Sequence, residues 1–366
     1  MNNLNIFNGA KVLITGHTGF KGTWLSLWLS YLGAQVCGVS DDIPTTPSNF
    51  LASNLTSYIK EDHRVDIRSA LELAAVVDKF QPDFVFHLAA QALVRRSYID
   101  PIETWQINTL GTVNLLDALK KIKKKCTVVM ITSDKCYDNV EWPWGYRETD
   151  RLGGPDPYSA SKGAAELAIK SYVKSFFSSG ESIRVGIGRA GNVIGGGDWA
   201  EDRIIPDCMR AASKGMAVEL RNPLATRPWQ HVLEPLSGYL NLAMELHNNS
   251  MLHSEAFNFG PPAEQNYAVG DLVLAMSKFW DKIKYEDISS QYGGPYESNL
   301  LKLNCDKALH YLKWHALWDF KDTIEKTVLW YREYYEGGSQ SIASFTISQI
   351  ENYMSDAVKK KLNWAL

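Results

Sequence analysis

Cysteine is scarce in this sequence, and its distribution supports neither a disulfide framework nor a zinc site. The five cysteines are odd in number, widely separated and never arranged as C-x-x-C. The eight histidines show no H-x-x-x-H spacing, and none is paired with a nearby cysteine, so no metal is predicted. A chain of 366 residues is long enough to bury a hydrophobic core without disulfide bonds or a structural metal. Unpaired thiols indicate a reducing cytoplasm.

Long apolar runs and a large excess of one charge are also missing. The most apolar helical segment, residues 20–32, is interrupted by Lys21, Ser26 and Ser30, whereas a bilayer-spanning helix needs about 20 apolar residues in a row. The N-terminus has no basic segment ahead of an apolar stretch, so we expect no signal peptide. With 38 Lys+Arg against 41 Asp+Glu, the net charge of -3 supplies no field for a polyanion. These absences argue against a membrane protein, an exported protein and a nucleic-acid-binding protein.

The first half of the chain alternates short apolar runs with longer segments of helical periodicity. The runs are apolar throughout rather than at every second residue, which is typical of parallel strands covered by helices on both faces. This order predicts a doubly wound parallel α/β sheet. The predicted strands are Lys11–Thr15, Gln35–Ser40, 84–88, 127–132 and 183–188, and the predicted helices are 19–32, 69–80, 100–122 and 157–177.

A glycine-rich turn joins the first predicted strand to the first predicted helix. Gly16, Gly19 and Gly22 form a G-x-x-G-x-x-G pattern in the sequence TGHTGFKG. Glycines at these positions allow the tight turn, the approach of a pyrophosphate to the backbone, and close packing of the helix on the sheet. Asp41 and Asp42 follow the second strand near the spacing of about 20 residues expected for a ribose-hydroxyl acceptor. Since a carboxylate there repels the extra phosphate of NADP, the turn predicts an NAD site.

Two side chains within the turn affect this prediction. The His17 imidazole is expected either to crowd the pyrophosphate, in which case His17→Gly tightens NAD binding, or to point away into solvent. Lys21 stands at the start of the helix, where an ammonium group assists anion binding. The cofactor contacts predicted here are Gly16, His17, Thr18, Gly19, Phe20, Lys21, Gly22 and Asp41.

The pattern changes after Arg189, where glycine and proline become frequent. We expect residues 1–190 to form the NAD-binding domain and residues 191–366 to form mainly a smaller substrate-binding lobe. The sequence shows no clear linker, so the two are expected to be interleaved. Helices are predicted in this half at 205–214, 236–247, 269–280 and 320–335.

Tyr158 and Lys162 lie near the start of a predicted helix. Asp156 is suited to the N-cap and Pro157 to the first helical position. The spacing of four residues puts the phenol and the ammonium group on one helix face. An adjacent ammonium and a cationic nicotinamide favour the phenolate, which makes Tyr158 a candidate general base for oxidation of an alcohol.

Three polar residues follow the strand at 127–132. Ser133, Asp134 and Lys135 are expected in the crevice at the carboxyl ends of the strands, where ligands bind in open α/β sheets. Ser133 can hydrogen-bond the Tyr158 phenol and a sugar hydroxyl. A carboxyl group and an amine are more than plain alcohol oxidation requires, so these residues suggest elimination coupled to oxidation.

These motifs together resemble a known family. The segments TGHTGFKG, HLAAQ (87–91), TSDKCYDN (132–139), YSASK (158–162) and RAGNVIGGGDW (189–199) are similar to the extended short-chain dehydrogenase/reductases that act on nucleotide sugars. RPWQHV (227–232) and Trp330-Tyr331 extend the similarity over nearly the whole chain. The resemblance implies a Rossmann sheet with a smaller C-terminal α/β substrate-binding lobe, a retained NAD, a homodimer or a dimer of dimers, and CDP-glucose as substrate.

The resemblance also implies a reaction in which water is removed from the sugar. Tyr158 deprotonates the C4 hydroxyl as hydride leaves C4, Asp134 protonates the departing C6 hydroxyl, and hydride returns to C6. Relatives that act on dTDP-glucose carry a glutamate as the C5 base where this chain has Lys135, which leaves the identity of the base open; a neutral Lys135, its pKa lowered by Lys162 and burial, is one candidate. The product would serve deoxy-sugar and surface-polysaccharide synthesis.

Further site residues are implied only by this resemblance. Those near NAD are Asp66, Ile67, Leu88, Ala89, Ala90 and Asn108, and those on the substrate side are Gln91, Ser133, Asn192, Arg203 and Arg227. Two other functions remain open at this point. A nucleotide-sugar 4-epimerase would use Tyr158 and Lys162 without needing Asp134, and a catalytically silent NAD-sensing protein would need none of the three.

Overall fold

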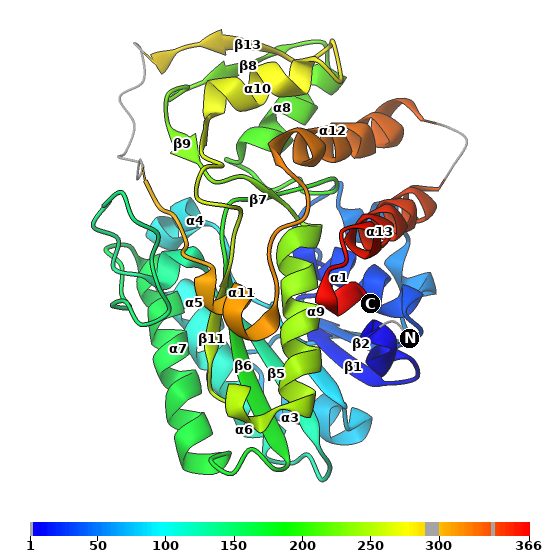
Figure 1. Ribbon diagram of the computed structural model, residues 1–366, viewed down its shortest axis with the longest axis vertical. Helices are drawn as coiled ribbons and strands as arrows, with labels where there is room; N and C mark the ends of the chain where they lie inside the picture. Colours follow the sequence, from blue (N-terminus) through cyan, green and yellow to red (C-terminus); the bar gives the residue numbers. More distant parts are fainter. Residues whose placement is uncertain (1–2, 290–299, 338–340) are drawn as a thin grey trace.

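The computed structural model describes residues 3–289, 300–337 and 341–366 (Figure 1). Its centre is a seven-stranded sheet in the order β11-β6-β5-β4-β1-β2-β3, with every neighbouring pair parallel. The doubly wound parallel sheet predicted from the apolar runs is therefore confirmed. The strands are β1 Lys11–Thr15, β2 Gln35–Ser40, β3 Glu61–Arg64, β4 Phe84–His87, β5 Cys126–Ile131, β6 Ile183–Ala190 and β11 Ala256–Phe259.

Helices cover both faces of the sheet, which explains why the strands are apolar throughout. In β1, Val12 and Ile14 pack into one hydrophobic core and Leu13 into the other. The helices α3, α6 and α7 contribute to the core around Leu13, and α1, α9 and α13 to the larger core on the other face. Their bounds are α1 Phe20–Tyr31, α3 Ala70–Phe80, α6 Thr112–Leu119, α7 Pro157–Phe176, α9 Leu233–Asn248 and α13 Ile342–Lys359.

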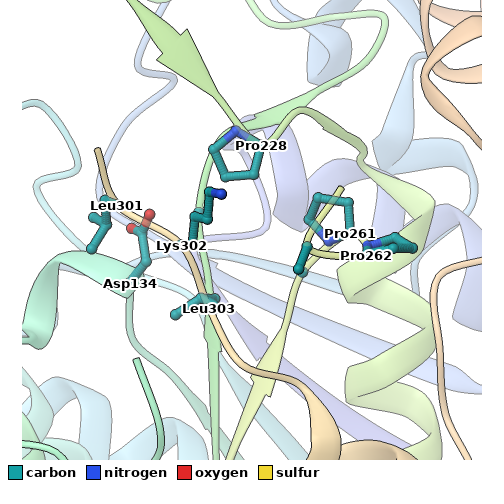
Figure 2. Close-up of a pocket in the computed structure, with 10 residues that line it drawn as sticks. Asp134, Pro228, Pro261, Pro262, Leu301, Lys302 and Leu303 are labelled. Carbon is teal, nitrogen blue, oxygen red and sulfur yellow. The ribbon is translucent and has the colours of Figure 1, made fainter. Parts of the chain in front are cut away.

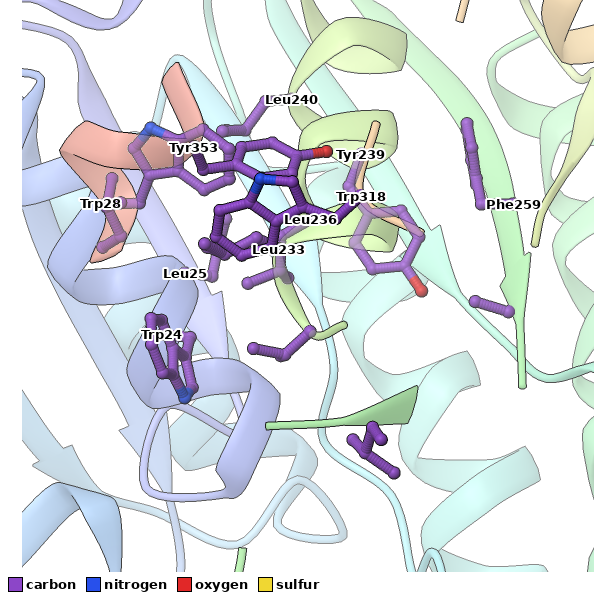
Figure 3. Packing of buried hydrophobic residues seen from close by; sticks show 14 of the residues in the cluster. Trp24, Leu25, Trp28, Leu233, Leu236, Tyr239, Leu240, Phe259, Trp318 and Tyr353 are labelled. Carbon is purple, nitrogen blue, oxygen red and sulfur yellow. The ribbon is translucent and has the colours of Figure 1, made fainter. Parts of the chain in front are cut away.

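Aromatic residues join α1, α9 and the C-terminal helix in the larger core. Figure 3 shows Trp24 and Trp28 of α1 near the leucines of α9. The Tyr353 ring of α13 lies edge-on to Trp28, with centroids 5.8 Å apart, and to Trp318, at 4.9 Å. The end of the chain is therefore part of the core that supports the first helix of the nucleotide-binding half.

The predicted helix at 100–122 contains a change of helix type. It is formed by α5 Pro101–Trp105, a π-helical turn at Gln106–Gly111, and α6. The remaining helices of this half are α2 Asn49–Ala52 and α4 Val94–Ile99. The strand β3 was not predicted because it is a short, charged edge strand with half-buried and exposed residues.

Smaller elements gather beyond the sheet, at the top of Figure 1. Two-stranded sheets pair β8 with β13, β7 with β10, and β9 with β12. The four helices predicted for this half are confirmed to within a few residues at each end. Their bounds, with those of the other elements, are β7 Val193–Ile194, α8 Ile204–Ser213, β8 Ala217–Leu220, β9 Thr226–Arg227, β10 Gln230–His231, β12 Tyr267–Ala268, α10 Val269–Ser277, β13 Lys284–Asp287, α11 Asp306–Leu312 and α12 Phe320–Glu336.

The central sheet uses chain from both sides of residue 190. The strand β11 pairs with β6, and α9 packs against β5 and β6. The domain boundary at residue 190 stays a prediction. Among the described residues, no helix combines the length and apolar character needed to cross a membrane.

Candidate active site

The glycine turn after β1 brings the backbone close to its neighbours. Gly16 has a φ of 78°, a left-handed conformation that favours glycine. A Cβ on Gly16 would lie 2.7 Å from the Ala89 nitrogen, and one on Gly22 would lie 2.0 Å from the Gly16 oxygen. A Cβ on Gly19 would meet only the Gly16 oxygen within 4 Å, at 3.3 Å. Because no side chain caps α1 at Gly19, this open turn fits a pyrophosphate bound by the first N–H groups of the helix.

The structure shows that the expectation of a His17 side chain in solvent was wrong. The alternative expectation, that the imidazole crowds the pyrophosphate, stays a prediction. The imidazole is fully buried, and it lies over β2. A Cβ on Gly38 would come within 2.3 Å of the ring, and Phe50 packs edge-on against it. Its Nε2 is 2.9 Å from Asp62 Oδ1. Burial lowers the pKa of His17, although Asp62 opposes this shift.

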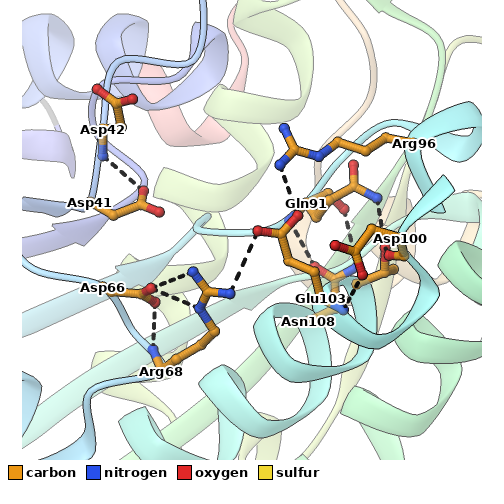
Figure 4. Close-up of polar contacts among 10 residues, drawn as sticks. Asp41, Asp42, Asp66, Arg68, Gln91, Arg96, Asp100, Glu103 and Asn108 are labelled. Carbon is orange, nitrogen blue, oxygen red and sulfur yellow. Dashed lines mark hydrogen bonds and ion pairs between the residues drawn. The ribbon is translucent and has the colours of Figure 1, made fainter.

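The acidic residues predicted near the adenosine end differ in their surroundings (Figure 4). Asp41, directly after β2, is exposed, and its Oδ1 accepts a hydrogen bond from the Asp42 backbone at 2.9 Å. The Asp66 carboxylate is bound by Arg68, whose Nε and backbone N–H donate at 2.7 and 2.8 Å. Asp41 is therefore the more accessible carboxylate for a ribose hydroxyl.

Asn108 lies in the π-helical turn and connects three segments. Its Oδ1 accepts from the Gln91 backbone N–H at 2.9 Å, and its Nδ2 donates to the Gln91 oxygen at 3.1 Å and to Ser161 Oγ at 3.0 Å. The Gln91 amide, drawn beside Asn108 in Figure 4, also donates to Thr104 Oγ1 and accepts from the Leu93 backbone. Both ends of the Gln91 amide are thus bonded within the protein, and its predicted contact with substrate stays a prediction.

The other residues predicted near NAD surround the carboxyl ends of β1 and β4. Ala89 N–H donates to Thr15 Oγ1 at 3.2 Å, and Thr18 Oγ1 donates to the Asp42 oxygen at 2.7 Å. Ile67 packs beneath the π-helical turn, where a Cβ on Gly111 would come within 2.5 Å of it. The structure therefore brings these parts of the predicted site together. Leu88 and Ala90 flank Ala89, and Phe20 begins α1.

Tyr158 and Lys162 are nearly completely buried on the first turns of α7. The Asp156 carboxylate caps this helix by accepting from the Ser159 N–H at 2.9 Å. Burial raises the pKa of Tyr158 to about 12, and the hydrogen bond with Ser133 lowers it only in part. Burial also lowers the pKa of Lys162 to about 8. For Tyr158, desolvation outweighs the lowering of the pKa by Ser133 and Arg203. That Lys162 favours the phenolate stays a prediction.

Ser133 and Asp134 lie directly after β5, as predicted, and both are buried. Ser133 Oγ donates to Asp134 Oδ1 at 2.9 Å and accepts from the Lys135 backbone N–H at 3.2 Å. The Asp134 carboxylate also raises the pKa of Lys21 and that of Tyr158, which places it near both groups. The Lys135 side chain is half-buried.

Lys21 and Arg203 bring positive charge to this crevice. The pKa of Lys21 is lowered to about 8 by burial and by Arg203, and Asp134 opposes the shift. Arg203 donates to Asp198 Oδ2 at 2.8 Å, an interaction that raises its pKa. The structure thus unites Arg203 with the predicted catalytic residues, and the same crevice holds two cationic side chains from distant parts of the chain.

Asn192 and Arg227 were also predicted on the substrate side. Asn192 has a φ of 50° and lies just after β6. Arg227 lies in β9, where its Nη1 donates to the Thr226 oxygen at 2.9 Å. The next residue, Pro228, lines the same hollow as Asp134. Arg227 is therefore one residue away from the lining of that hollow.

The sequence motifs did not reveal a buried ion pair behind these residues. Glu166 follows Tyr158 and Lys162 along α7 at intervals of four residues, and Arg189 stands near the end of β6. Arg189 Nε donates to Glu166 Oε1 at 2.7 Å, and both side chains are fully buried. Thr132 Oγ1 donates to the same oxygen at 2.7 Å. The spacing of four residues from Lys162 could have indicated Glu166. Its partner Arg189 could not be identified in this way, because only the fold brings Arg189 next to Glu166.

Strand pairing also brings together three potential metal ligands among the described residues. Side-chain ligand atoms of Cys37, Glu61 and His63 lie within 4.8 Å of one another. His63 Nε2 is 2.8 Å from Glu61 Oε2, and burial raises the pKa of Cys37 to about 12. Histidine and cysteine spacing did not indicate this group, since β2 and β3 are separate in the sequence.

Comparison with known proteins points to enzymes of nucleotide-sugar metabolism. Residues 13–327 match the family model described as GDP-mannose 4,6 dehydratase. The chain is 46% identical over 358 residues to CDP-glucose 4,6-dehydratase of Salmonella typhimurium, which covers 96% of this chain and 98% of that protein. It is 24% identical to dTDP-glucose 4,6-dehydratase of Shigella flexneri, covering 88% and 92% of the two chains.

Solved structures show the same fold. UDP-glucose 4-epimerase of Thermotoga maritima, in a structure with UDP-glucose, has a TM-score of 0.76 at 20% identity and covers 89% of this chain and all of that one. An epimerase of Methanothermobacter thermautotrophicus also has a TM-score of 0.76, at 21% identity, and covers 92% and 96% of the two chains.

Proposed function

The chain belongs to the family of the GDP-mannose 4,6 dehydratase model, and on that premise we propose that it dehydrates CDP-glucose to CDP-4-keto-6-deoxyglucose. The observation that carries this function is the buried Asp134 beside Ser133 and Tyr158. An epimerase needs a base at C4 but no acid for a leaving hydroxyl. The extended similarity to a CDP-glucose enzyme supports the cytidine nucleotide.

NAD is the cofactor that the residues fit. The open glycine turn suits its pyrophosphate and the exposed Asp41 suits a ribose hydroxyl. The glycine turn and Asp41 would hold this cofactor, which would supply the hydride chemistry that oxidation at C4 and reduction at C6 require. The described cysteines are free, and we place the enzyme in a reducing cytoplasm, where it would supply deoxy sugars for surface polysaccharide.

Three side chains move or hold protons in this proposal. Tyr158 Oη takes the proton of the C4 hydroxyl, assisted by its hydrogen bond with Ser133 and by the positive charge near it. Asp134 then donates a proton to the C6 hydroxyl as the C6–O bond breaks and water leaves. The C5 proton is released to a base, for which we propose Lys135 because it lies directly after Asp134. A solvent-derived proton later returns to C5.

The substrate is held from the other side of the crevice. We propose that Arg203 and Arg227 bind the diphosphate, since a guanidinium group donates two parallel hydrogen bonds to phosphate oxygens. Asn192 and Gln91 are proposed to contact the sugar. Arg203 is well placed for this role because it lies near both Lys21 and Tyr158.

A second copy of the chain is the proposed protein partner. The helices α4 and α5 pack beside α7 and expose several large apolar side chains. Burying such a face in a homodimer or a dimer of dimers would remove it from water. The exposed residues are Tyr98, Ile99, Ile102, Trp105 and Leu167.

The function is tested by incubating the NAD-loaded protein with CDP-glucose in deuterated water. We expect a 4-keto-6-deoxy sugar carrying deuterium at C5, detected by NMR and mass spectrometry, because the C5 proton is exchanged with solvent during dehydration. Tyr158→Phe, which keeps the ring but lacks the phenol oxygen, is expected to form no product. A panel of glucose nucleotides with different bases tests the preference for cytosine.

Two results would replace this proposal. A sugar inverted at C4 without deuterium at C5 would show an epimerase. NAD binding without any change in CDP-glucose or the other nucleotides would favour an NAD-sensing protein.

A further inference from the structure

The Asp134 carboxylate lies against the backbone of Gly191, in space that any other residue would fill. A Cβ built on Gly191 would be 1.8 Å from Asp134 Oδ2, 2.1 Å from Cγ and 2.5 Å from Oδ1. Real Cβ atoms essentially never have non-bonded contacts below 3.0 Å, so either the Cβ or the carboxylate would have to move. The φ of Gly191 is outside the left-handed range, so its backbone does not itself demand glycine. The requirement for glycine comes from the Asp134 carboxylate, which occupies the space of a Cβ.

Neither group can move away easily. Asp134 is only 5% exposed, and the Ser133 hydroxyl donates to its Oδ1. The Gly191 oxygen accepts from Gln230 Nε2 at 3.0 Å, and the same amide nitrogen donates to the Phe259 oxygen at 3.0 Å. Gln230 therefore ties the chain after β6 to the end of β11. A methyl group at position 191 would displace the Asp134 carboxylate, because this side chain is held less firmly than the Gly191 backbone.

A hollow opens beside this contact, as Figure 2 shows. Asp134, Gly191 and Lys302 line it together with mainly apolar residues, and Figure 2 shows Leu301 beside Asp134 and the prolines after β11 farther away. Asp134 and Lys302 are the charged residues of this mainly apolar lining. A carboxyl group in such surroundings suits a carbon that loses a hydroxyl and becomes a methyl group. The apolar residues are Pro228, Pro261, Pro262, Ala263, Leu301 and Leu303.

We propose that Gly191 is a positioning residue for Asp134: its missing side chain lets the carboxyl group lie at the wall of the hollow, which receives the C5–C6 end of the sugar. This inference rests on the proposed dehydration. Gly191 acts chiefly at the elimination step, because Tyr158 and not Asp134 takes the proton of the C4 hydroxyl. The Asp134 carboxylate affects Tyr158 only as a neighbouring charge that raises its pKa.

The test is Gly191→Ala, measured by rapid mixing with CDP-glucose and by product formation. We expect NADH absorbance to rise and persist, because oxidation at C4 proceeds while elimination stalls. Formation of the keto-deoxy product should fall about 100-fold or more, the lower end of what general acid catalysis contributes. Gly270→Ala is the matched control, since a Cβ there meets only ordinary contacts, 3.4 Å from the Pro223 oxygen at the closest, and it should match the wild type.

A double-mutant cycle separates this role from general damage to the fold. If Gly191 acts through Asp134, Asp134→Asn combined with Gly191→Ala should form product no more slowly than Asp134→Asn alone. If Gly191→Ala fails to fold, Asp134→Ala with Gly191→Ala should fold, because the clashing carboxylate is removed. Losses that add in the double variant, or a Gly191→Ala enzyme with wild-type turnover, would overturn the inference. Absence of keto sugar with the wild-type enzyme would instead refute the proposed function.

Discussion

Tyr158 and Lys162 are nearly completely buried and Lys21 is partly buried, and burial shifts the pKa of each toward its neutral form. The pKa of Tyr158 rises to about 12, and those of the two lysines fall to about 8. A lysine with a pKa near 8 exchanges protons readily at neutral pH. Arg203 already lowers the pKa of the phenol in part, and a cationic cofactor ring would lower it further, which ties the proposed role of Tyr158 as a base to the bound cofactor.

His17 illustrates how a residue within a binding motif can serve the interior. The imidazole fills the space over Gly38 and bonds to Asp62. We therefore expect His17→Gly to lower the free energy of unfolding by about 3 kcal/mol, as for other large-to-small core substitutions, and to leave NAD binding no tighter. Denaturant unfolding and calorimetric NAD titration measure the two quantities.

The matched control is His63→Ala, which removes a partly exposed histidine from the neighbouring strand β3. It should cost less than about 1 kcal/mol, as is usual for surface ion pairs. Tighter NAD binding by His17→Gly would instead support the alternative expectation that the imidazole crowds the pyrophosphate.

Among the secondary-structure elements, α7 links the proposed catalytic residues to the sheet. Tyr158, Lys162 and Glu166 follow one another along its length, and Glu166 pairs with Arg189 near the end of β6. Arg189 Nη1 also donates to Tyr137 Oη at 2.6 Å, beyond the segment that carries Ser133 and Asp134. The ion pair therefore holds the helix, the strand and the loop in one arrangement.

Removing one member of this pair should be costly. Glu166→Gln leaves the Arg189 charge buried without its carboxylate, and we expect a loss of about 3–5 kcal/mol in unfolding free energy. The pKa of Lys162 should fall further, because the Glu166 carboxylate raises it. Urea denaturation and the pH dependence of turnover measure these effects.

Replacement of both partners provides the comparison. Glu166→Leu with Arg189→Met leaves no isolated charge and should cost less than Glu166→Gln. An equal or larger loss in the double variant would mean that the hydrogen bonds to Thr132 and Tyr137, rather than the charges, dominate.

Across the whole molecule, buried titratable groups set how stability depends on pH. Burial lowers the pKa of His87 and of His231 to about 3 and raises that of Glu234 to about 7. Below about pH 6.5, these two histidines are protonated in the unfolded chain but stay neutral in the folded protein. The free energy of unfolding therefore decreases as the pH falls. Glu234 has the opposite effect on stability between pH 4.5, the usual pKa of a glutamate, and pH 7. This single carboxyl group offsets the effect of only one of the two histidines.

We expect the free energy of unfolding to decrease from pH 6.5 to pH 5, by about 1.4 kcal/mol per pH unit for each net proton taken up. His231→Phe should reduce this slope by removing one titrating ring. The substitution keeps the shape that packs edge-on against Trp24 and Trp318 and removes a buried Nε2 that has no hydrogen-bond partner in the structure. Urea denaturation at several pH values is the measurement, and an unchanged slope would contradict the assignment.

Local sequence determined much of this protein. Apolar runs specified the buried parallel strands, glycines specified the turn at β1, and a spacing of four residues put Tyr158 and Lys162 on one face of α7. These features depend on contacts within a few residues, so the pattern contains the necessary information.

Tertiary structure decided the features that depend on residues far apart in the chain. It turned His17 toward Asp62, set the Asp134 carboxylate against Gly191, paired Glu166 with Arg189 and added β11 to the sheet. Each of these contacts joins segments whose separation in the sequence carries no periodic signal. Close packing determines which side chains meet and how far each is removed from water, and therefore where protons are held.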